Sequence, residues 1–128
     1  MNSSIFINIF VVVLLLIFIY IRFGPTKGLR TLKAKEFQRE IEQSSERVLI
    51  DVREPSEYKN GHIPGAKNFP LSQISHYISD IPNDQEIFLY CKSGMRSKNA
   101  ALILRKNGYT RLNHLQGGIG SWRGGISK

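Results

Sequence analysis

The chain begins with one long apolar run and continues with short apolar segments separated by polar ones. The first run, Ile5 to Ile21, is interrupted only by Asn8. As a helix it spans about 26 Å, slightly short of a hydrocarbon core about 30 Å thick. Phe23 extends the run, and Arg22 can reach the lipid headgroups. The pattern therefore predicts a transmembrane helix within residues 1–23.

A cleaved signal peptide is the alternative for this segment. Such a peptide starts with basic residues and ends at a cleavage site between small side chains. Residues 1–4 contain no Lys or Arg, and no small-x-small tripeptide follows Ile21. The sequence therefore favours an uncleaved anchor over residues 1–23, a linker rich in turn formers over residues 24–28, and one folded domain over residues 29–128.

The apolar pattern after residue 28 predicts alternating strands and helices. Short apolar runs predict strands at residues 29–32, 48–51, 66–69, 86–90 and 111–115. Helices are predicted at residues 34–43, 71–81 and 97–106, with a single polar turn at 55–60. This alternation is typical of an α/β domain in which helices flank a central, mostly parallel sheet. Such sheets place their chemistry beyond the carboxyl ends of the strands.

The net charge of +8 is concentrated beside the long apolar run. Residues 22–35 hold five of the 18 Lys and Arg residues and no acidic one. Because a nucleic-acid-binding protein spreads its basic residues over a face, we interpret this cluster as a topology signal and expect no nucleic-acid partner. Basic flanks of a transmembrane helix stay in the cytoplasm. We therefore expect a single-pass protein of the cell membrane whose domain lies on the cytoplasmic side.

Cys91 is the only cysteine in the chain, which excludes an internal disulfide and a multi-cysteine zinc site. It stands between a predicted strand and a predicted helix, where loop N–H groups and the helix dipole favour an anion. Gly94 permits the positive φ that a tight anion-binding loop needs, and Lys92 and Arg96 add two cations. A lone cysteine is more often a small buried hydrophobe, but this polar loop is a poor core environment. The sequence predicts a reactive thiolate at Cys91.

Four segments in this order resemble the signatures of single-domain rhodaneses, and the resemblance runs from about residue 29 to the C-terminus. The segments are Val48–Pro55 followed by Glu57-Tyr58, Gly61–Ala66, Cys91–Ser97, and Leu115–Gly118 followed by Trp122. The resemblance implies a rhodanese fold and sulfur transfer through a persulfide on Cys91. A small anionic donor such as thiosulfate would supply the sulfur, and a thiol or protein acceptor would receive it. No cofactor or metal enters this scheme.

The resemblance and the local chemistry together suggest roles for the residues that follow the nucleophile. Arg96 is the first candidate to contact an anionic donor, because a guanidinium can grip an oxyanion with two N–H groups. Lys92 is the second candidate, and Met95 is placed to tune the choice of donor or acceptor. The expected substrate-binding residues are Lys92, Ser93, Gly94, Met95, Arg96 and Ser97.

Three other residues of the signatures are interpreted as structural support. Asp51 ends a buried strand and is expected to accept hydrogen bonds from loop amides. Arg53 is expected to pair with Glu54 or Glu57, and the ring of His62 is expected to tie down a turn. Further along the chain, His76 and His114 are expected to be ordinary surface or packing residues, and Trp122 a lid on the core.

Two other functions remain to be weighed against sulfur transfer. Related cysteine phosphatases separate cysteine and arginine by five residues to enclose a phosphate. Here four residues lie between Cys91 and Arg96, which argues against phosphatase chemistry. The second alternative is a non-enzymatic, membrane-tethered module that docks a protein or delivers persulfide. The intact Cys91 and Arg96 favour the enzyme, since an inactive module often loses its nucleophile.

Overall fold

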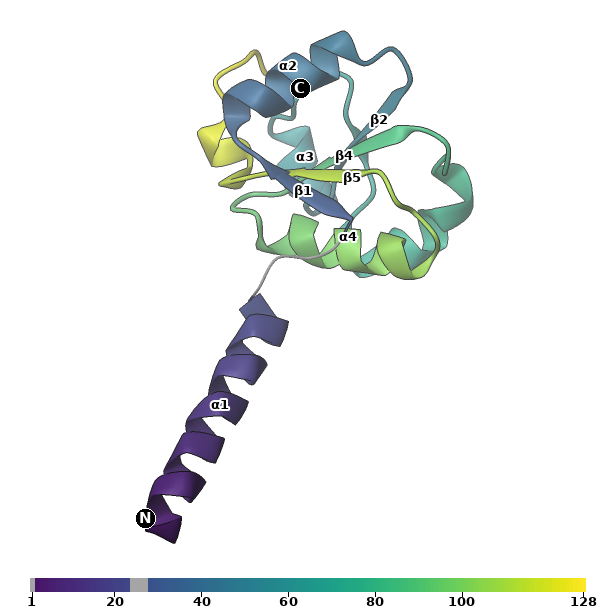
Figure 1. Ribbon diagram of the computed structural model, residues 1–128. Coiled ribbons are helices and arrows are strands. Elements are labelled where there is room, and N and C mark those ends of the chain that lie inside the picture. Colours follow the sequence, from purple (N-terminus) through teal and green to yellow (C-terminus); the bar gives the residue numbers. More distant parts are fainter. Residues whose placement is uncertain (1, 24–27) are drawn as a thin grey trace.

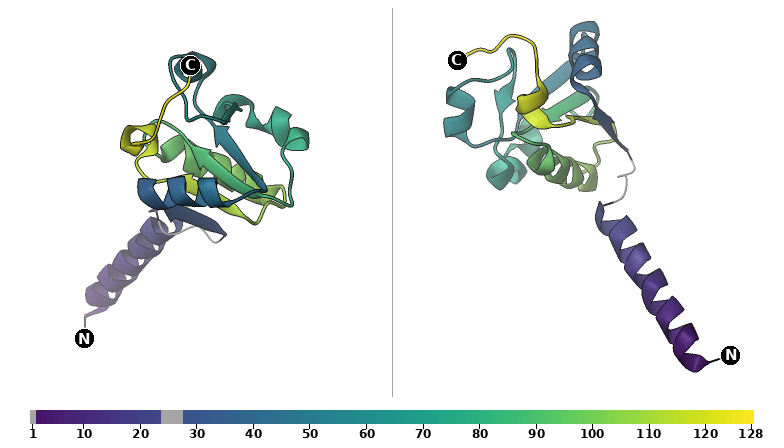
Figure 2. Two further views of the ribbon diagram at one scale, coloured as in Figure 1. Left: turned by 90° about the horizontal axis from the view of Figure 1, so that it is seen from above. Right: turned by 90° about the vertical axis from the view of Figure 1, so that its left-hand side faces the viewer.

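The computed structural model describes residues 2–23 and 28–128, so most of the expected linker lies outside the described residues. The first element is the helix α1, Ser3–Phe23, which extends away from the folded domain in every view (Figures 1 and 2). It is long and apolar enough to cross a membrane, and none of the residues Ser3–Arg22 is buried. Length and composition are thus those of a membrane span.

The domain is built on a sheet of five strands. These are β1 (Leu29–Leu32), β2 (Arg47–Asp51), β3 (Lys67–Asn68), β4 (Glu86–Tyr90) and β5 (Leu112–Leu115). They lie in the order β1-β5-β4-β2-β3, and every neighbouring pair is parallel. The predicted α/β domain with a central parallel sheet is therefore confirmed. The carboxyl ends of β2 and β4 meet at one edge, which is where the motifs place their polar residues.

The connections are α2 (Ala34–Gln43), α3 (Pro55–Lys59), η1 (Leu71–Asp80), α4 (Met95–Lys106) and η2 (Gly118–Ser121). The element η1 is a 3₁₀-helix, whereas the apolar spacing only indicated a helix. A 3₁₀-helix places residues three apart on one face, and Leu71 and Ile74 both pack against the core. The short helix η2 was not predicted. Finally, α4 begins at Met95, two residues before the predicted start, because Gly94 turns the chain into the helix with a φ of 112°.

Side chains alternate between the two faces of the central strands and form two separate cores. The cluster on the side of α4 includes Val48, Ile50, Ile87, Leu89 and Cys91. The cluster on the side of α2 includes Leu49, Phe88 and Tyr90, with Phe37 from the helix itself. Figure 1 shows α2 and α4 on opposite faces of the sheet. Because Cys91 continues the alternation of β4, its side chain lies on the face that α4 covers.

Candidate active site

The sulfur of Cys91 lies beneath the loop that joins β4 to α4. The backbone N–H of Gly94 donates a hydrogen bond to Sγ over 2.9 Å, and the Ser97 hydroxyl oxygen lies 3.6 Å from Sγ. The residue has no exposed surface, so the sulfur is enclosed, although the polar loop was expected to be a poor core environment. Any reagent that reaches this sulfur must first displace part of the loop.

The amino end of α4 is aimed at the same sulfur atom. Gly94 is the N-cap of this helix of 12 residues, and it is Gly94 that donates its N–H to Sγ. The unpaired N–H groups and the dipole at a helix amino end favour negative charge. The positive φ expected at Gly94 is present. The arrangement therefore offers an anionic sulfur both a direct donor and a favourable field.

The turn that follows β5 holds the backbone of this loop from the other side. Gly117 and Gly118 have φ values of 77° and 63°, and the N–H of Ile119 donates to the carbonyl oxygen of Cys91 over 2.9 Å. A Cβ atom added to Gly118 would lie 2.2 Å from the carbonyl oxygen of Lys92. Only a glycine allows the two backbones to approach this closely, which explains the position of the last signature.

Arg96 is held by an acidic residue from the opposite side of the site. Its Nη1 and Nη2 donate to the two carboxylate oxygens of Glu57 over 2.7 and 3.0 Å. The hydrogen bond from Arg96 lowers the pKa of Glu57 from its usual range to about 2, so the pair is fully ionised at neutral pH. A guanidinium has five N–H donors, and three of them remain after Glu57 has taken two.

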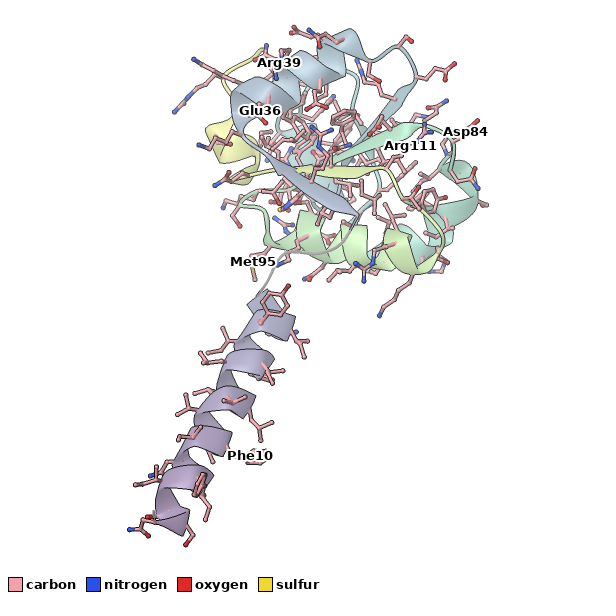
Figure 3. All side chains as sticks on the ribbon, viewed as in Figure 1. Phe10, Glu36, Arg39, Asp84, Met95 and Arg111 are labelled. Atoms are coloured by element: carbon pink, nitrogen blue, oxygen red, sulfur yellow. The ribbon has the colours of Figure 1, made fainter. Side chains whose placement is uncertain are left out.

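The other loop residues named from the sequence face outward. Lys92 and Ser93 are exposed, and Met95 is 70% exposed. Figure 3 shows Met95 pointing away from the domain at the start of α4. Of the six expected substrate-binding residues, the structure thus brings Gly94 and Ser97 to the sulfur and places these three at the rim. A partner molecule can touch the rim without any rearrangement.

Asp51 and Arg53 form a buried ion pair behind the site. The carboxylate of Asp51 accepts from Nε and Nη2 of Arg53 over 3.0 and 2.7 Å, and from the backbone N–H of Arg53 over 2.9 Å. Nη2 also donates to the carbonyl oxygen of Gly61 over 2.7 Å. The expected pairing of Arg53 with Glu54 or Glu57 is therefore wrong. The side chain of Arg53 turns inward because the buried Asp51 carboxylate requires a charged partner.

His62 lies in the turn that follows α3. Its Nδ1 is 3.0 Å from the carbonyl oxygen of Tyr58, and its ring stacks on the Tyr58 ring with centroids 3.8 Å apart. Its backbone exchanges hydrogen bonds with Ser127. These contacts serve the structure of the turn. Over residues 2–23 and 28–128, no group of three or more His, Cys, Asp or Glu residues could hold a metal ion.

His114 is the residue near the sulfur that the sequence did not single out. It is only 6% exposed, with Nδ1 2.9 Å from the Ser97 hydroxyl oxygen and Nε2 3.0 Å from the Thr31 hydroxyl oxygen. Burial and the positive charge of Lys98 lower the pKa of His114 below its usual value. Alternation along β5 could have indicated this position, because His114 follows Leu112 by two residues and so shares its face.

Comparisons with known proteins agree with this geometry. The sequence model of the family described as the rhodanese-like domain matches residues 33–124. The Bacillus subtilis protein YqhL is 44% identical over 98 residues, which cover 77% of this chain and 75% of that protein. The thiosulfate sulfurtransferase GlpE of Pseudoalteromonas translucida is 33% identical over 81 residues, covering 63% of this chain and 77% of GlpE.

The fold comparison agrees with the sequence matches. A rhodanese-related protein from Thermoplasma volcanium superimposes with a TM-score of 0.68 at 27% identity, covering 77% of this chain and 97% of that one. The superposition and the family match over residues 33–124 lead to one conclusion. The chain belongs to the rhodanese-like domain family.

Proposed function

We propose that this protein is a sulfurtransferase that carries sulfane sulfur on Cys91. The observation that carries the proposal is the hydrogen bond from the Gly94 N–H to Sγ at the amino end of α4. A donor and a helix dipole at this place stabilise a thiolate and, after reaction, the charge on a persulfide. Similarity to a thiosulfate sulfurtransferase supports thiosulfate as the donor class.

The proposed reaction consists of two displacements at sulfur. The Cys91 thiolate attacks the outer sulfur of thiosulfate, the sulfur–sulfur bond of the donor breaks, and sulfite leaves with its electron pair. The enzyme now holds a persulfide. A thiolate of a small molecule or a protein then attacks the terminal sulfur and takes it away. This second step returns Cys91 to the thiolate, so no external oxidant or reductant is consumed.

Mass spectrometry of the full chain tests the first displacement directly. Cys91 is the only cysteine, so a mass increase of one sulfur atom that a reducing thiol reverses reports on this position. We expect that increase after exposure to thiosulfate, with release of one sulfite per chain. An unchanged mass under conditions in which iodoacetamide alkylates the same protein would contradict the proposed function.

A non-enzymatic module is the second candidate, and two observations favour it. The sulfur has no exposed surface, and Glu57 already occupies two donors of Arg96. In such a module, the exposed rim of Lys92, Ser93 and Met95 would serve as a docking surface for a protein. If sulfur transfer from thiosulfate to cyanide by the wild type equals that of Cys91→Ser, the module is the correct interpretation.

Replacement of Glu57 by glutamine tests whether Arg96 receives the donor. The Glu57→Gln substitution removes the negative charge that competes with an anionic donor for the guanidinium. An ion pair of this exposure contributes up to about 1 kcal/mol, so we expect the KM for thiosulfate to fall by about two- to fivefold. Steady-state kinetics of the full chain in detergent, at constant ionic strength, measure the change.

The matched control for this substitution is Glu36→Gln. Glu36 is an exposed residue on α2 (Figure 3), and its replacement changes the net charge by the same amount on the helix that covers the face of the sheet opposite α4 (Figure 1). The KM should stay at the wild-type value in this control. An unchanged or higher KM in Glu57→Gln would mean that Arg96 serves only to hold α3 against the loop.

We also propose that α1 anchors the domain to the cytoplasmic face of the cell membrane. The helix is long and apolar, with Arg22 in its last turn, and basic residues flank it on the C-terminal side. A protease added to intact cells should leave the domain uncleaved, and should degrade it once the membrane is permeabilised. Cleavage in intact cells would reverse the topology, and release of the chain by a salt wash would exclude the anchor.

A further inference from the structure

A chain of hydrogen bonds connects the sulfur of Cys91 to the first strand of the sheet. It runs from Sγ to the Ser97 hydroxyl (3.6 Å), on to Nδ1 of His114 (2.9 Å), and from Nε2 to the Thr31 hydroxyl (3.0 Å). The register of the sheet creates this chain. Residue His114 lies opposite Thr31 in the pairing of β1 with β5, and opposite Leu89 in the pairing of β4 with β5. All these side chains lie on the face covered by α4.

The protons in this chain can be placed from the acceptors that surround Ser97. The Ser97 hydroxyl donates its single proton to the carbonyl oxygen of Gly94 over 3.1 Å, and a carbonyl oxygen can only accept. The His114 nitrogen that faces Ser97 must then be the donor, so the ring is the Nδ1–H tautomer. Its Nε2 accepts from the Thr31 hydroxyl. Every group in the chain is satisfied by this one assignment.

The ring cannot take a proton from the sulfur along this chain, because the nitrogen that faces Ser97 already carries one. Burial is the main reason why the pKa of His114 is lowered, and Lys98 on α4 adds to it. The other titratable group in the chain is Cys91 on the far side of Ser97. A relay that moved the thiol proton onto the ring would create an imidazolium beside Lys98 in a buried place, at a high cost in free energy.

We infer that His114 is a positioning residue that acts through Ser97 to favour the ionised form of the Cys91 sulfur. Because the ring always donates to the Ser97 oxygen, the Ser97 proton never has to point toward the ring. It can turn from the Gly94 carbonyl to Sγ when the sulfur becomes an anion, and the donation from His114 strengthens that bond. This inference rests on the proposed function for its purpose, since sulfur transfer begins with the anion.

The test compares the pH dependence of Cys91 alkylation in four versions of the full chain. These are the wild type, His114→Leu, His114→Asn and Leu112→Ala. Leucine removes both ring nitrogens, whereas asparagine places an amide N–H near the position of Nδ1. Leu112 is 1% exposed and lies on the same face of β5, so its replacement weakens the core without touching the hydrogen bonds. The rate with iodoacetamide reports the fraction of ionised sulfur.

The expected result is a midpoint of the pH profile that rises by about one unit in His114→Leu. The midpoint should stay near the wild-type value in His114→Asn and in Leu112→Ala. An unchanged midpoint in His114→Leu overturns the inference, as does an equal shift in Leu112→Ala, which would indicate a loss of packing. A second ionisation in the wild type that His114→Leu abolishes also overturns it, because the ring would then act as a base.

This test does not depend on sulfur transfer. Alkylation needs no sulfur donor, so the profile can be measured even if thiosulfate leaves the mass of the protein unchanged. If thiosulfate leaves the mass unchanged but the midpoint of alkylation is higher in His114→Leu than in the wild type, the proposed function is excluded and the inferred role of His114 stands. If thiosulfate forms the persulfide but the midpoint is the same in the wild type and in His114→Leu, the proposed function stands and the inferred role of His114 is excluded.

Discussion

Replacement of Cys91 by serine is expected to reduce sulfur transfer from thiosulfate to the uncatalysed background. Serine is a far weaker nucleophile than a thiolate, and no other cysteine in the chain can replace it. Loss of a covalent nucleophile costs on the order of 10⁴-fold or more in rate. The thiosulfate:cyanide reaction of the full chain in detergent measures the loss, with formation of thiocyanate as the readout.

Cys91→Ser should fold like the wild type, so a loss of activity can be assigned to the loss of the thiolate. The serine hydroxyl can accept from the Gly94 N–H and bond to Ser97, the two contacts that the sulfur has now. We expect a melting temperature within a few degrees of the wild type. Residual transfer above a few per cent of the wild-type rate in a protein with the same melting temperature would mean that Cys91 is not the nucleophile.

Replacement of Gly118 by alanine is expected to damage both stability and activity. The new Cβ would lie 2.2 Å from the carbonyl oxygen of Lys92 and 2.6 Å from that of Cys91, and neither backbone atom can move freely. The positive φ of 63° adds further strain. Together these effects should cost about 3 kcal/mol or more. Thermal unfolding and transfer rates of the same preparation measure both losses.

The control for this prediction is Gly108→Ala. Gly108 also has a positive φ, of 94°, but a Cβ there would meet nothing within 4 Å. Alanine at this position should cost only about 1 kcal/mol, the price of its backbone conformation, and leave sulfur transfer intact. If both variants lose the same stability and the same activity, close contact with the loop is not what makes Gly118 necessary.

The sequence was sufficient to predict the architecture, because the apolar pattern carries the information that the sheet needs. The runs that became β2 and β4 are apolar on both faces, and each ends where its polar motif begins. The same logic located Cys91 beyond a strand and before a helix. The start of α4 and the type of η1 differed, and the short η2 was not predicted.

The contacts within the site could not be predicted in the same way, because they depend on distances across the fold. Arg53 has three acidic residues within four positions in the sequence, and only the burial of Asp51 decides among them. The partner of Arg96 comes from α3, 39 residues earlier. His114 gains its contacts from Thr31 on the neighbouring strand β1 and from Ser97 on α4, and no local pattern encodes this combination.

The pairing of β1 with β5 also constrains how the protein is made. These strands are the first and the last of the domain in the chain, yet they lie side by side in the sheet. During synthesis β1 therefore waits for its neighbour until β5 has also left the ribosome. By then α1, which precedes β1 in the chain, has already been synthesised, so this apolar helix is exposed to its surroundings before the sheet is complete.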